Sequence, residues 1–445
     1  MNETLRMLRN VVASKPLARP VGRVVAVQGG SIKLSGLAQD ACIGDLLELK
    51  RLNGTTLNGE VIQIEDETVF MLPETTPEKV AVGDPAALSP VPDFAPCGQW
   101  IGRMIDPFGR PLDGRPLGPG AMSHDVLAPP PQAAKRKPLG DRLATGLAVL
   151  NTILPIVRGQ RIGLFAGSGV GKSRLLSSLA NGMQADVVVI ALIGERGREV
   201  NEFVHRVLGP EGMKRSIIVV ATSDQPATTR RRCAWAAMAV AEHFRDQGQN
   251  VLFLADSVTR FAEAHREIST LSGEVPALRG YPPSLSPLLT ALCERAGPGS
   301  NGQGDITAVF SVLVAGSDME EPVADILRGT LDGHILLDRS IAERGRFPAI
   351  DVARSVSRSL PDAATEKENV LISETRKLLG AYEQSEVMIK AGLYQAGTDT
   401  KLDQAVQIWD ELDAFFAKSD DVGISNSFDR LSVILRRAGI QPASR

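Results

Sequence analysis

Polar and apolar residues alternate over short stretches in the first part of the chain, between residues 20 and 90. Gly-Gly, Asn-Gly and Pro turns separate these stretches, and a period of two is typical of β-strands with one buried face. We expect strands at residues 21–27, 31–34, 46–49, 60–64 and 68–72. Strands this short and this close together predict a small β-barrel.

The middle of the chain changes to continuous apolar runs that are followed by helical periodicity. Buried strands are expected at residues 162–165, 186–192, 216–221, 250–255 and 306–314. Helical patterns are expected at residues 174–183, 197–208, 227–247 and 258–269. This alternation predicts an α/β fold with a mostly parallel sheet and helices on both faces, in which ligands bind at the carboxyl ends of the strands.

The last part of the chain has helical periodicity alone. Helices are expected at residues 366–382, 384–391, 402–416 and 427–437, with a loop at 392–400. The Gly- and Pro-rich residues 93–120 predict a series of turns, and residues 128–138 predict an extended connector. Near the N-terminus, apolar residues at helical spacing predict a helix that either packs on its own domain or docks on a partner: Leu5, Leu8, Val11 and Val12.

A small-residue loop after the first of these buried strands carries the clearest chemistry. Residues 166–173 read Ala-Gly-Ser-Gly-Val-Gly-Lys-Ser, and the first position of such patterns is usually Gly. Glycines let backbone N–H groups surround phosphate oxygens at a helix N-terminus, and the alternative is an ordinary glycine turn. Lys172 can reach the terminal phosphates and Ser173 can bind Mg²⁺. The candidate binding residues are Gly167, Ser168, Gly169, Val170, Gly171, Lys172 and Ser173.

Two carboxylates follow predicted strands. Asp256 closes the run 250–255, where a carboxylate is costly unless it is solvated or paired with a cation. We expect Asp256 to hold Mg²⁺ largely through water, a role that can coexist with capping the next helix. Glu195 lies just beyond strand 186–192, with Arg196 beside it. Glu195 can orient and polarise a water opposite a leaving phosphate, and the residues alone leave a surface salt-bridge cluster equally open.

A third candidate region lies late in the same domain, at residues 347–351 and 355–358. A single cation supplied across a subunit interface can stabilise transition-state charge, as arginine fingers do. The chain has 49 Lys and Arg residues, so spacing alone does not select Arg358.

The overall composition narrows the classes of partner. A net charge of −3 with both signs mixed, and only 4% aromatic residues, argue against a nucleic-acid surface. The cysteines are far apart, which favours reduced thiols over a disulfide framework or a metal site: Cys42, Cys97, Cys233 and Cys293. No apolar run approaches the roughly 18 residues that a membrane span needs.

Six motifs, in order along the chain, resemble those of the rotary ATPase catalytic-subunit superfamily. They are 166–173, Ile193-Gly-Glu-Arg-Gly-Arg-Glu199, Asp256-Ser-Val-Thr-Arg-Phe261, Arg279-Gly-Tyr-Pro-Pro-Ser284, Leu331-Asp-Gly-His334 and Phe347-Pro-Ala-Ile-Asp351. More narrowly, the chain resembles the ATPases of type III protein export, and among these the flagellar export ATPases. The resemblance covers roughly residues 20–440 and includes the turn segment 102–114.

This resemblance implies a domain organisation and a set of ligands. A RecA-like P-loop ATPase domain is expected at residues 93–360, between an N-terminal β-barrel at 20–92 and a C-terminal α-helical domain at 361–445. Residues 1–19 would form a docking helix or extension. The implied ligands are ATP and Mg²⁺, and the implied assembly is a homohexamer with ATP at its subunit interfaces.

The resemblance also gives roles to the candidate residues. Lys172 and Ser173 would bind phosphate and Mg²⁺, and Asp256 would be the Mg²⁺-linked acid. Glu195 would activate the attacking water, with Arg196 beside it. Two further roles follow for residues late in the domain. Arg358 would be the arginine finger that reaches into the neighbouring site, and Phe347 would be an aromatic ring that packs against adenine.

Glu195 and Arg358 occur in one chain, so each copy could hydrolyse ATP at one face and complete the active site of its neighbour with the other face. The implied partners are regulator and central-stalk proteins, an export gate and chaperone–substrate complexes, without nucleic acid. We expect loop 392–400 to lie near the pore of the ring and to respond to binding of the stalk protein. The alternative is that this loop only connects two helices. The expected location is the cytoplasm, peripheral to the inner membrane at the export apparatus.

Other enzymes and one inactive class remain as alternatives. A virulence-type (injectisome) secretion ATPase has nearly the same motifs, and Ala255 and the basic residues 224–232 depart from the usual pattern. In a rotary ATP synthase-type catalytic subunit, Arg358 would be redundant. A hexameric nucleic-acid translocase is disfavoured by the acidic net charge and few aromatic residues. An inactive nucleotide-binding scaffold is disfavoured by Glu195.

Overall fold

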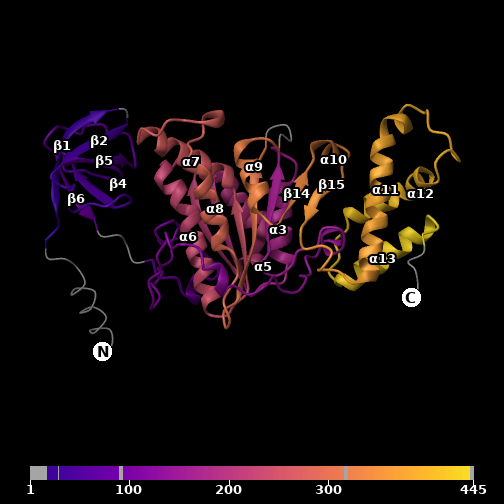
Figure 1. Cartoon of the computed structure of the whole chain (residues 1–445). Coiled ribbons are helices and arrows are strands. Elements are labelled where there is room, and N and C mark those ends of the chain that lie inside the picture. Colours follow the sequence, from indigo (N-terminus) through magenta and orange to yellow (C-terminus); the bar gives the residue numbers. More distant parts are fainter. Residues whose placement is uncertain (1–17, 29, 90–93, 315–318, 441–445) are drawn as a thin grey trace. The chain divides into compact units, whose positions relative to one another are not determined.

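The computed structural model describes residues 18–28, 30–89, 94–314 and 319–440, in two compact units. Figure 1 labels many of their helices and strands. The first unit contains the N-terminal strands together with Gln225–Thr229 and Ala264–Pro282. The second contains Phe94–Asp224, Arg230–Glu263 and Pro283–Arg445.

A closed antiparallel barrel forms most of the first unit and confirms the predicted fold. In pairing order its strands are β1 (Val21–Gln28), β2 (Ser31–Ser35), β5 (Thr68–Pro73), β4 (Thr56–Glu65), β3 (Leu46–Lys50) and β6 (Pro85–Ser89). Every second residue of β2 and β3 is buried, as a period of two requires. The sequence pattern missed β6, whose Pro-Ala-Ala-Leu-Ser has little strand character, yet β6 pairs with both β1 and β3 and closes the barrel.

A largely parallel sheet organises the second unit. Its order is β15 (Ile350–Ser357), β14 (Gly333–Leu337), β8 (Arg161–Ala166), β13 (Asp305–Leu313), β11 (Val251–Asp256), β9 (Val187–Glu195), β10 (Ser216–Thr222) and β7 (Arg103–Ile105). Among the described strands of this sheet, only β15 and the short β12 (Gly297–Pro298) are antiparallel to their neighbours. The prediction of turns alone at residues 93–120 was wrong at β7, which pairs with β10 and buries Ile105.

Helices flank this sheet (Figure 1). They are α2 (Ala148–Asn151), α3 (Lys172–Gly182), α4 (Gly197–Glu202), α5 (Gly209–Met213), α6 (Ala227–Asp246), α7 (Val258–Leu271), α8 (Leu285–Arg295), α9 (Pro322–Thr330) and α10 (Arg339–Glu343). Short 3-10 turns occur at η1 (Gly98–Trp100), η2 (Ala133–Lys135) and η4 (Leu278–Gly280). The predicted helix 197–208 is α4 followed by a π-helix, η3 (Phe203–Leu208). A π-helix is rare and often marks a functional site.

The C-terminal helices are α11 (Glu366–Lys390), α12 (Thr400–Phe416) and α13 (Ile424–Arg437). The prediction of separate helices at 366–382 and 384–391 was wrong, because α11 continues through the exposed Glu383 and Gln384. Apolar residues of all three helices share one hydrophobic core with α2 and α3, which is why they fall in the second unit. The domain boundary at residue 360 stays a prediction.

The predicted N-terminal docking helix lies almost wholly outside the described residues. Among those described, no helix is both long enough and apolar enough to span a membrane.

Candidate active site

A phosphate-binding loop joins the end of β8 to the start of α3. Two of its glycines, Gly169 (φ 78°) and Gly171 (φ 92°), have left-handed backbone angles that other residues rarely adopt. Gly171 is the N-cap of α3, and Lys172 is the first helical residue. A loop of this geometry presents backbone N–H groups to a phosphate at a helix N-terminus.

Three predicted side chains meet beside this loop, and together with Ser311 we call them the Lys172 cluster. The Lys172 ammonium forms a close ion pair with the Asp256 carboxylate, and its Nζ lies 4.0 Å from Oε1 of Glu195. The Ser311 hydroxyl donates a hydrogen bond to Oδ1 of Asp256 at 2.8 Å. The carboxylates come from the carboxyl ends of the parallel strands β9 and β11, as the α/β pattern predicts.

The donor groups around Asp256 suit a magnesium ion. Asp256 is 3% exposed, and the next residue, Ser257, has a buried hydroxyl without a hydrogen-bond partner. Ser173 follows Lys172 in α3. In the described part of the chain, no three His, Cys, Asp or Glu side chains are grouped as a metal site. One carboxylate with a few hydroxyls fits Mg²⁺, which usually keeps several waters and takes other ligands from substrate phosphates.

The Glu195 carboxyl is tuned toward neutral pH. Burial and, next, the negative charge of Asp256 raise the pKa of Glu195 to about 7, while Lys172 opposes this rise. A carboxylate with a pKa in this range can accept a proton from water at physiological pH. The alternative role of Glu195 in a surface salt-bridge cluster does not match this environment, since its side chain is only 21% exposed.

Two arginines lie near Glu195, and sequence reasoning assigned only one of them. Arg196 precedes α4, and its 75% exposed side chain pairs with Glu199 at 3.4 Å, so a role in fixing Glu195 stays a prediction. Arg260, in α7, lies against Gly194: its Cβ is 3.1 Å from the position that a Cβ on Gly194 would occupy. Its hydrogen bond from Nη1 to Glu263 is the main cause of its raised pKa, and the charge of Glu195 contributes. The sequence feature that could have identified Arg260 is its position four residues after Asp256, in the motif at residues 256–261.

Phe347 lies against the phosphate loop. Its ring carbons Cδ1 and Cε1 are 3.2 and 3.3 Å from the position that a Cβ on Gly171 would occupy. The side chain stays 43% exposed, so a flat base beside the loop has an aromatic surface on which to stack.

Arg358 lies elsewhere in the unit. It follows β15 at one edge of the sheet, and its exposed guanidinium donates to the backbone carbonyl of Arg328 at 3.2 Å. It makes none of the contacts of the Lys172 cluster in the described structure. This placement leaves its role at a neighbouring copy as a prediction.

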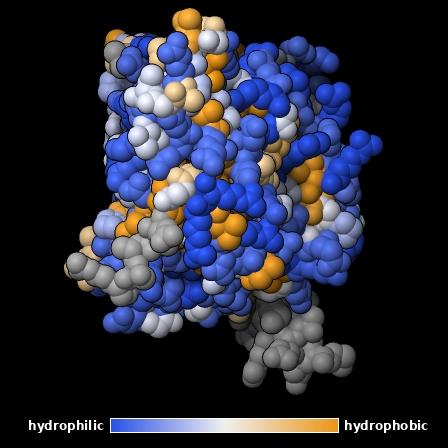
Figure 2. Space-filling view, turned by 90° about the vertical axis from the view of Figure 1, so that its right-hand side faces the viewer, coloured by the Kyte–Doolittle hydropathy of each residue, from blue (hydrophilic) through white to orange (hydrophobic). Residues whose placement is uncertain are grey.

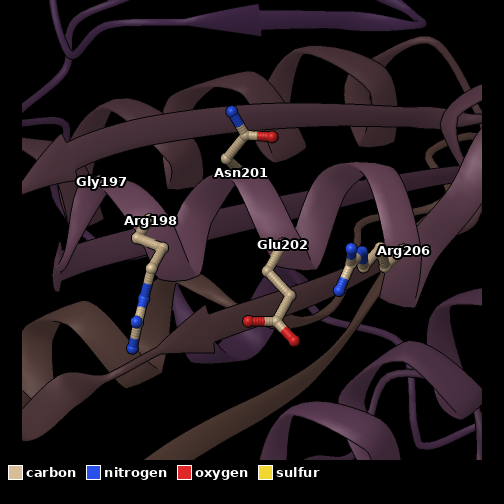
Figure 3. A pocket seen from close by; sticks show the side chains of 5 residues that line it. All are labelled: Gly197, Arg198, Asn201, Glu202 and Arg206. Carbon is tan, nitrogen blue, oxygen red and sulfur yellow. The ribbon is translucent and has the colours of Figure 1, made fainter.

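A shallow pocket of about 690 Å³ lies directly after the Glu195 loop, along α4 and η3. Its lining residues are Gly197, Arg198, Asn201, Glu202 and Arg206, and Figure 3 shows that Arg198 and Glu202 project from the same side of the helix. Sequence reasoning did not predict this pocket, because helical periodicity gives no sign of the π-helix that follows α4.

Comparisons with known proteins identify the family. The model of the ATP synthase alpha/beta family, nucleotide-binding domain, matches residues 146–357, and that of the T3SS EscN ATPase C-terminal domain matches residues 364–431. The chain is 43% identical to the flagellum-specific ATP synthase of Caulobacter vibrioides, over 96% of this chain and 99% of that protein. It is 39% identical to the type 3 secretion system ATPase of Pseudomonas syringae pv. syringae, over 97% and 98%.

The solved structures agree with the sequence comparisons. The assembled ATPase EscN from the type III secretion system of enteropathogenic E. coli matches with a TM-score of 0.86 and 36% identity, over 93% of this chain and 100% of that one. EscN in complex with its central stalk EscO matches with a TM-score of 0.83. The chain therefore belongs to the ATP synthase alpha/beta family, in the branch of the flagellar and type III secretion ATPases, and is an ATP-hydrolysing enzyme.

Proposed function

We propose that this chain hydrolyses Mg–ATP in a homohexamer and couples hydrolysis to the delivery and unfolding of flagellar export substrates. The observation that carries the proposal is the Lys172 cluster beside the phosphate loop. It joins a phosphate-binding cation, a buried acid and a carboxylate of near-neutral pKa. The flagellar assignment is supported by the flagellum-specific ATP synthases among its relatives.

The residues of the cluster divide the chemistry between them. Lys172 and the loop bind the β- and γ-phosphates, and Phe347 stacks on the adenine. Ser173 and Asp256 would hold Mg²⁺, which would neutralise charge on the phosphate oxygens when bound. Glu195 orients the attacking water and accepts its proton as the new bond to the γ-phosphorus forms and the bond to the β-phosphate oxygen breaks.

Each active site is completed by the next copy in the ring. A copy presents Glu195 at its own loop and Arg358 at one sheet edge, so head-to-tail contacts can close a ring of identical sites. Specific ATPase activity should therefore rise with protein concentration as rings form. The measurement is initial rate per milligram across a dilution series, with ring formation followed by light scattering. A flat specific activity while the scattering rises would contradict the shared site.

The C-terminal domain would receive the central-stalk partner. The end of α11 and the loop that follows it expose apolar side chains, among them Val387 (80% exposed) and Leu393 (70% exposed). Figure 2 faces these helices and shows apolar patches on a mostly hydrophilic surface. In the same assay, an added stalk protein should raise the rate. Replacing residues 392–398 by a Gly/Ser linker, which keeps Asp399 as the N-cap of α12, should remove that increase while leaving the basal rate unchanged.

The remaining partners are proposed from the family. They are a regulator, the export gate and chaperone–substrate complexes, which would hold the enzyme at the inner membrane. A virulence-type role is the second candidate, favoured by the likeness to EscN. Restored swimming of a flagellar-export-deficient host that expresses this chain would support the flagellar role, and restored effector secretion alone would support the virulence role.

The activity should fall on the acidic side of neutrality. Glu195 accepts a proton only when it is ionised, and its pKa is raised to about 7 by burial and Asp256. We expect kcat/KM for ATP to be roughly tenfold lower one pH unit below that pKa than on the plateau above it. Binding of a fluorescent ATP analogue over the same range serves as the control. A flat kcat/KM between pH 6 and pH 8 would contradict the assignment.

A further inference from the structure

The start of β8 carries a second charged cluster, at the other end of the strand from the phosphate loop. The backbone N and the Nε of Arg161 both donate to Oδ2 of Asp332 at 3.0 Å, and Nη2 donates to Oδ1 at 3.1 Å. The backbone N of Asp332 donates in return to the carbonyl of Arg161 at 2.8 Å. We call this pair the Arg161–Asp332 clamp. Glu294 also forms an ion pair with Arg161.

The clamp fixes the backbone carbonyl that holds Arg358. The carbonyl of Asp332 accepts the backbone N–H of Arg358 at 3.0 Å and the side-chain amide of Gln160 at 3.0 Å. Gly333 lets these segments approach, since a Cβ there would lie 2.5 Å from the carbonyl oxygen of Val356 and 3.4 Å from the backbone N of Arg358. The position of the Arg358 backbone therefore depends on where Asp332 is held.

The side chain of Arg358 depends on the same segment. Its Nη2 donates to the carbonyl of Arg328 at 3.2 Å. Arg328 lies in the last turn of α9, which ends at Thr330, two residues before Asp332. Both contacts that orient Arg358 thus come from residues 328–332, and Arg161 anchors the end of that segment to β8.

We propose that Asp332, through its clamp with Arg161, is a positioning residue that sets Arg358 for the active site of the neighbouring copy. This inference rests on the proposed function, in which Arg358 completes that site. Asp332 touches no nucleotide in this scheme and acts only through the backbone and guanidinium contacts of Arg358. The motif Leu331-Asp-Gly-His334 thereby gains a role that its sequence alone does not give it.

The test variant is Asp332→Asn. The side chains of Arg161 and Asp332 are 16% and 25% exposed, so their pairing is sheltered from water. The asparagine side chain has one accepting oxygen in place of two, and its NH₂ group would face the arginine donors, so the clamp loosens. We expect kcat to fall at least tenfold with KM for ATP and the affinity for a fluorescent nucleotide unchanged, because the phosphate loop is at the other end of β8. Arg161→Lys, which keeps the charge but loses the bidentate pair, should show the same split.

The matched control is Glu368→Gln. Glu368 pairs with Arg142 at 2.7 Å with similarly sheltered side chains, 17% and 14% exposed, and this pair makes no hydrogen bond or ion pair with Arg358 in the described structure. Its kcat should stay within about twofold of the parent, since Gln also suits a capping box. Thermal unfolding of all variants shows that they are folded before their rates are compared.

Mixing experiments separate a positioning role from a structural one. In mixed rings, an Asp332→Asn copy keeps its own Glu195 and needs a well-placed arginine from its neighbour. ATPase activity should therefore recover when Asp332→Asn is mixed with Glu195→Gln, whose Arg358 is intact, and should not recover when it is mixed with Arg358→Ala. Recovery of the Asp332→Asn rate with both variants would show that the positioning role is wrong. So would recovery with neither variant, when Glu195→Gln and Arg358→Ala do restore activity to each other. If Glu195→Gln and Arg358→Ala fail to rescue each other, the shared site itself is wrong, and the inference fails with it.

Discussion

Replacing Glu195 by Gln should lower kcat about a thousandfold, because a positioned general base contributes on this order and the amide cannot accept the proton of the attacking water. Gln has nearly the same shape as Glu. The phosphate loop and the pair between Lys172 and Asp256 remain in place, so binding of a fluorescent ATP analogue should stay within about twofold of the parent. Steady-state ATPase assays and titrations with the analogue measure the two quantities.

The chain supplies a carboxylate on a neighbouring helix as a control for this variant. Glu211 lies on α5 and pairs with Lys214 at 2.7 Å, with its side chain 83% exposed, so Glu211→Gln should leave kcat nearly unchanged. The thermal stability of Glu195→Gln gives a second test. Because burial and Asp256 raise the pKa of Glu195, its ionised form is unfavourable in the folded protein, and Glu195→Gln should not lower the unfolding temperature at pH 8. A large loss of both activity and stability would point to a structural role instead.

Arg358→Ala should also lower kcat about a thousandfold, the lower range for loss of an arginine finger. The guanidinium of Arg358 is exposed and contacts only a backbone carbonyl in the described structure, so its removal should cost little stability. Arg354, on the strand β15 that precedes Arg358, is 52% exposed and pairs weakly with Asp351 at 3.9 Å. Arg354→Ala is the matched control and should keep most of the activity.

The mixture of Glu195→Gln and Arg358→Ala gives the sharpest readout. An Arg358→Ala copy keeps its own Glu195 and gains an intact arginine from an adjacent Glu195→Gln copy. In an equimolar, randomly assembled ring, up to about a quarter of the interfaces should be complete. The recovered rate should approach that fraction when the copies are mixed before assembly. Absence of recovery in rings shown to contain both copies would mean that each site is self-contained.

Local patterns predicted the parts of this fold that depend on local chemistry. The alternating strands, the buried runs and the phosphate loop each carry their signal within a few residues. The helices α8, α9 and α10 were not predicted. The missed strands β6, β7, β14 and β15 pair with strands that are distant in the sequence. β6 has small residues and a proline but completes two pairings, and β7 lies in a turn-rich segment that adds to the edge of the sheet at β10.

The candidate site shows the same division. Lys172, Ser173 and Asp256 were predicted because loop chemistry and strand ends are visible in the sequence. The contact between Lys172 and Asp256 could not be predicted, since it depends on the strand order β8, β13, β11, which places Ser311 of the middle strand against Asp256. Arg260 was missed for a similar reason: its nearness to Glu195 comes from the close approach of α7 to Gly194.

The short strand β8 has a consequence for the direction of the whole assembly. Its last residue, Ala166, leads into the phosphate loop, and its first residue, Arg161, anchors the segment that contacts Arg358. It pairs with a parallel neighbour on each side, β13 and β14. In the proposed head-to-tail ring, each copy would hold its own nucleotide at one end of β8 and serve a single neighbour from the other end, so the ring would have a fixed direction around its axis.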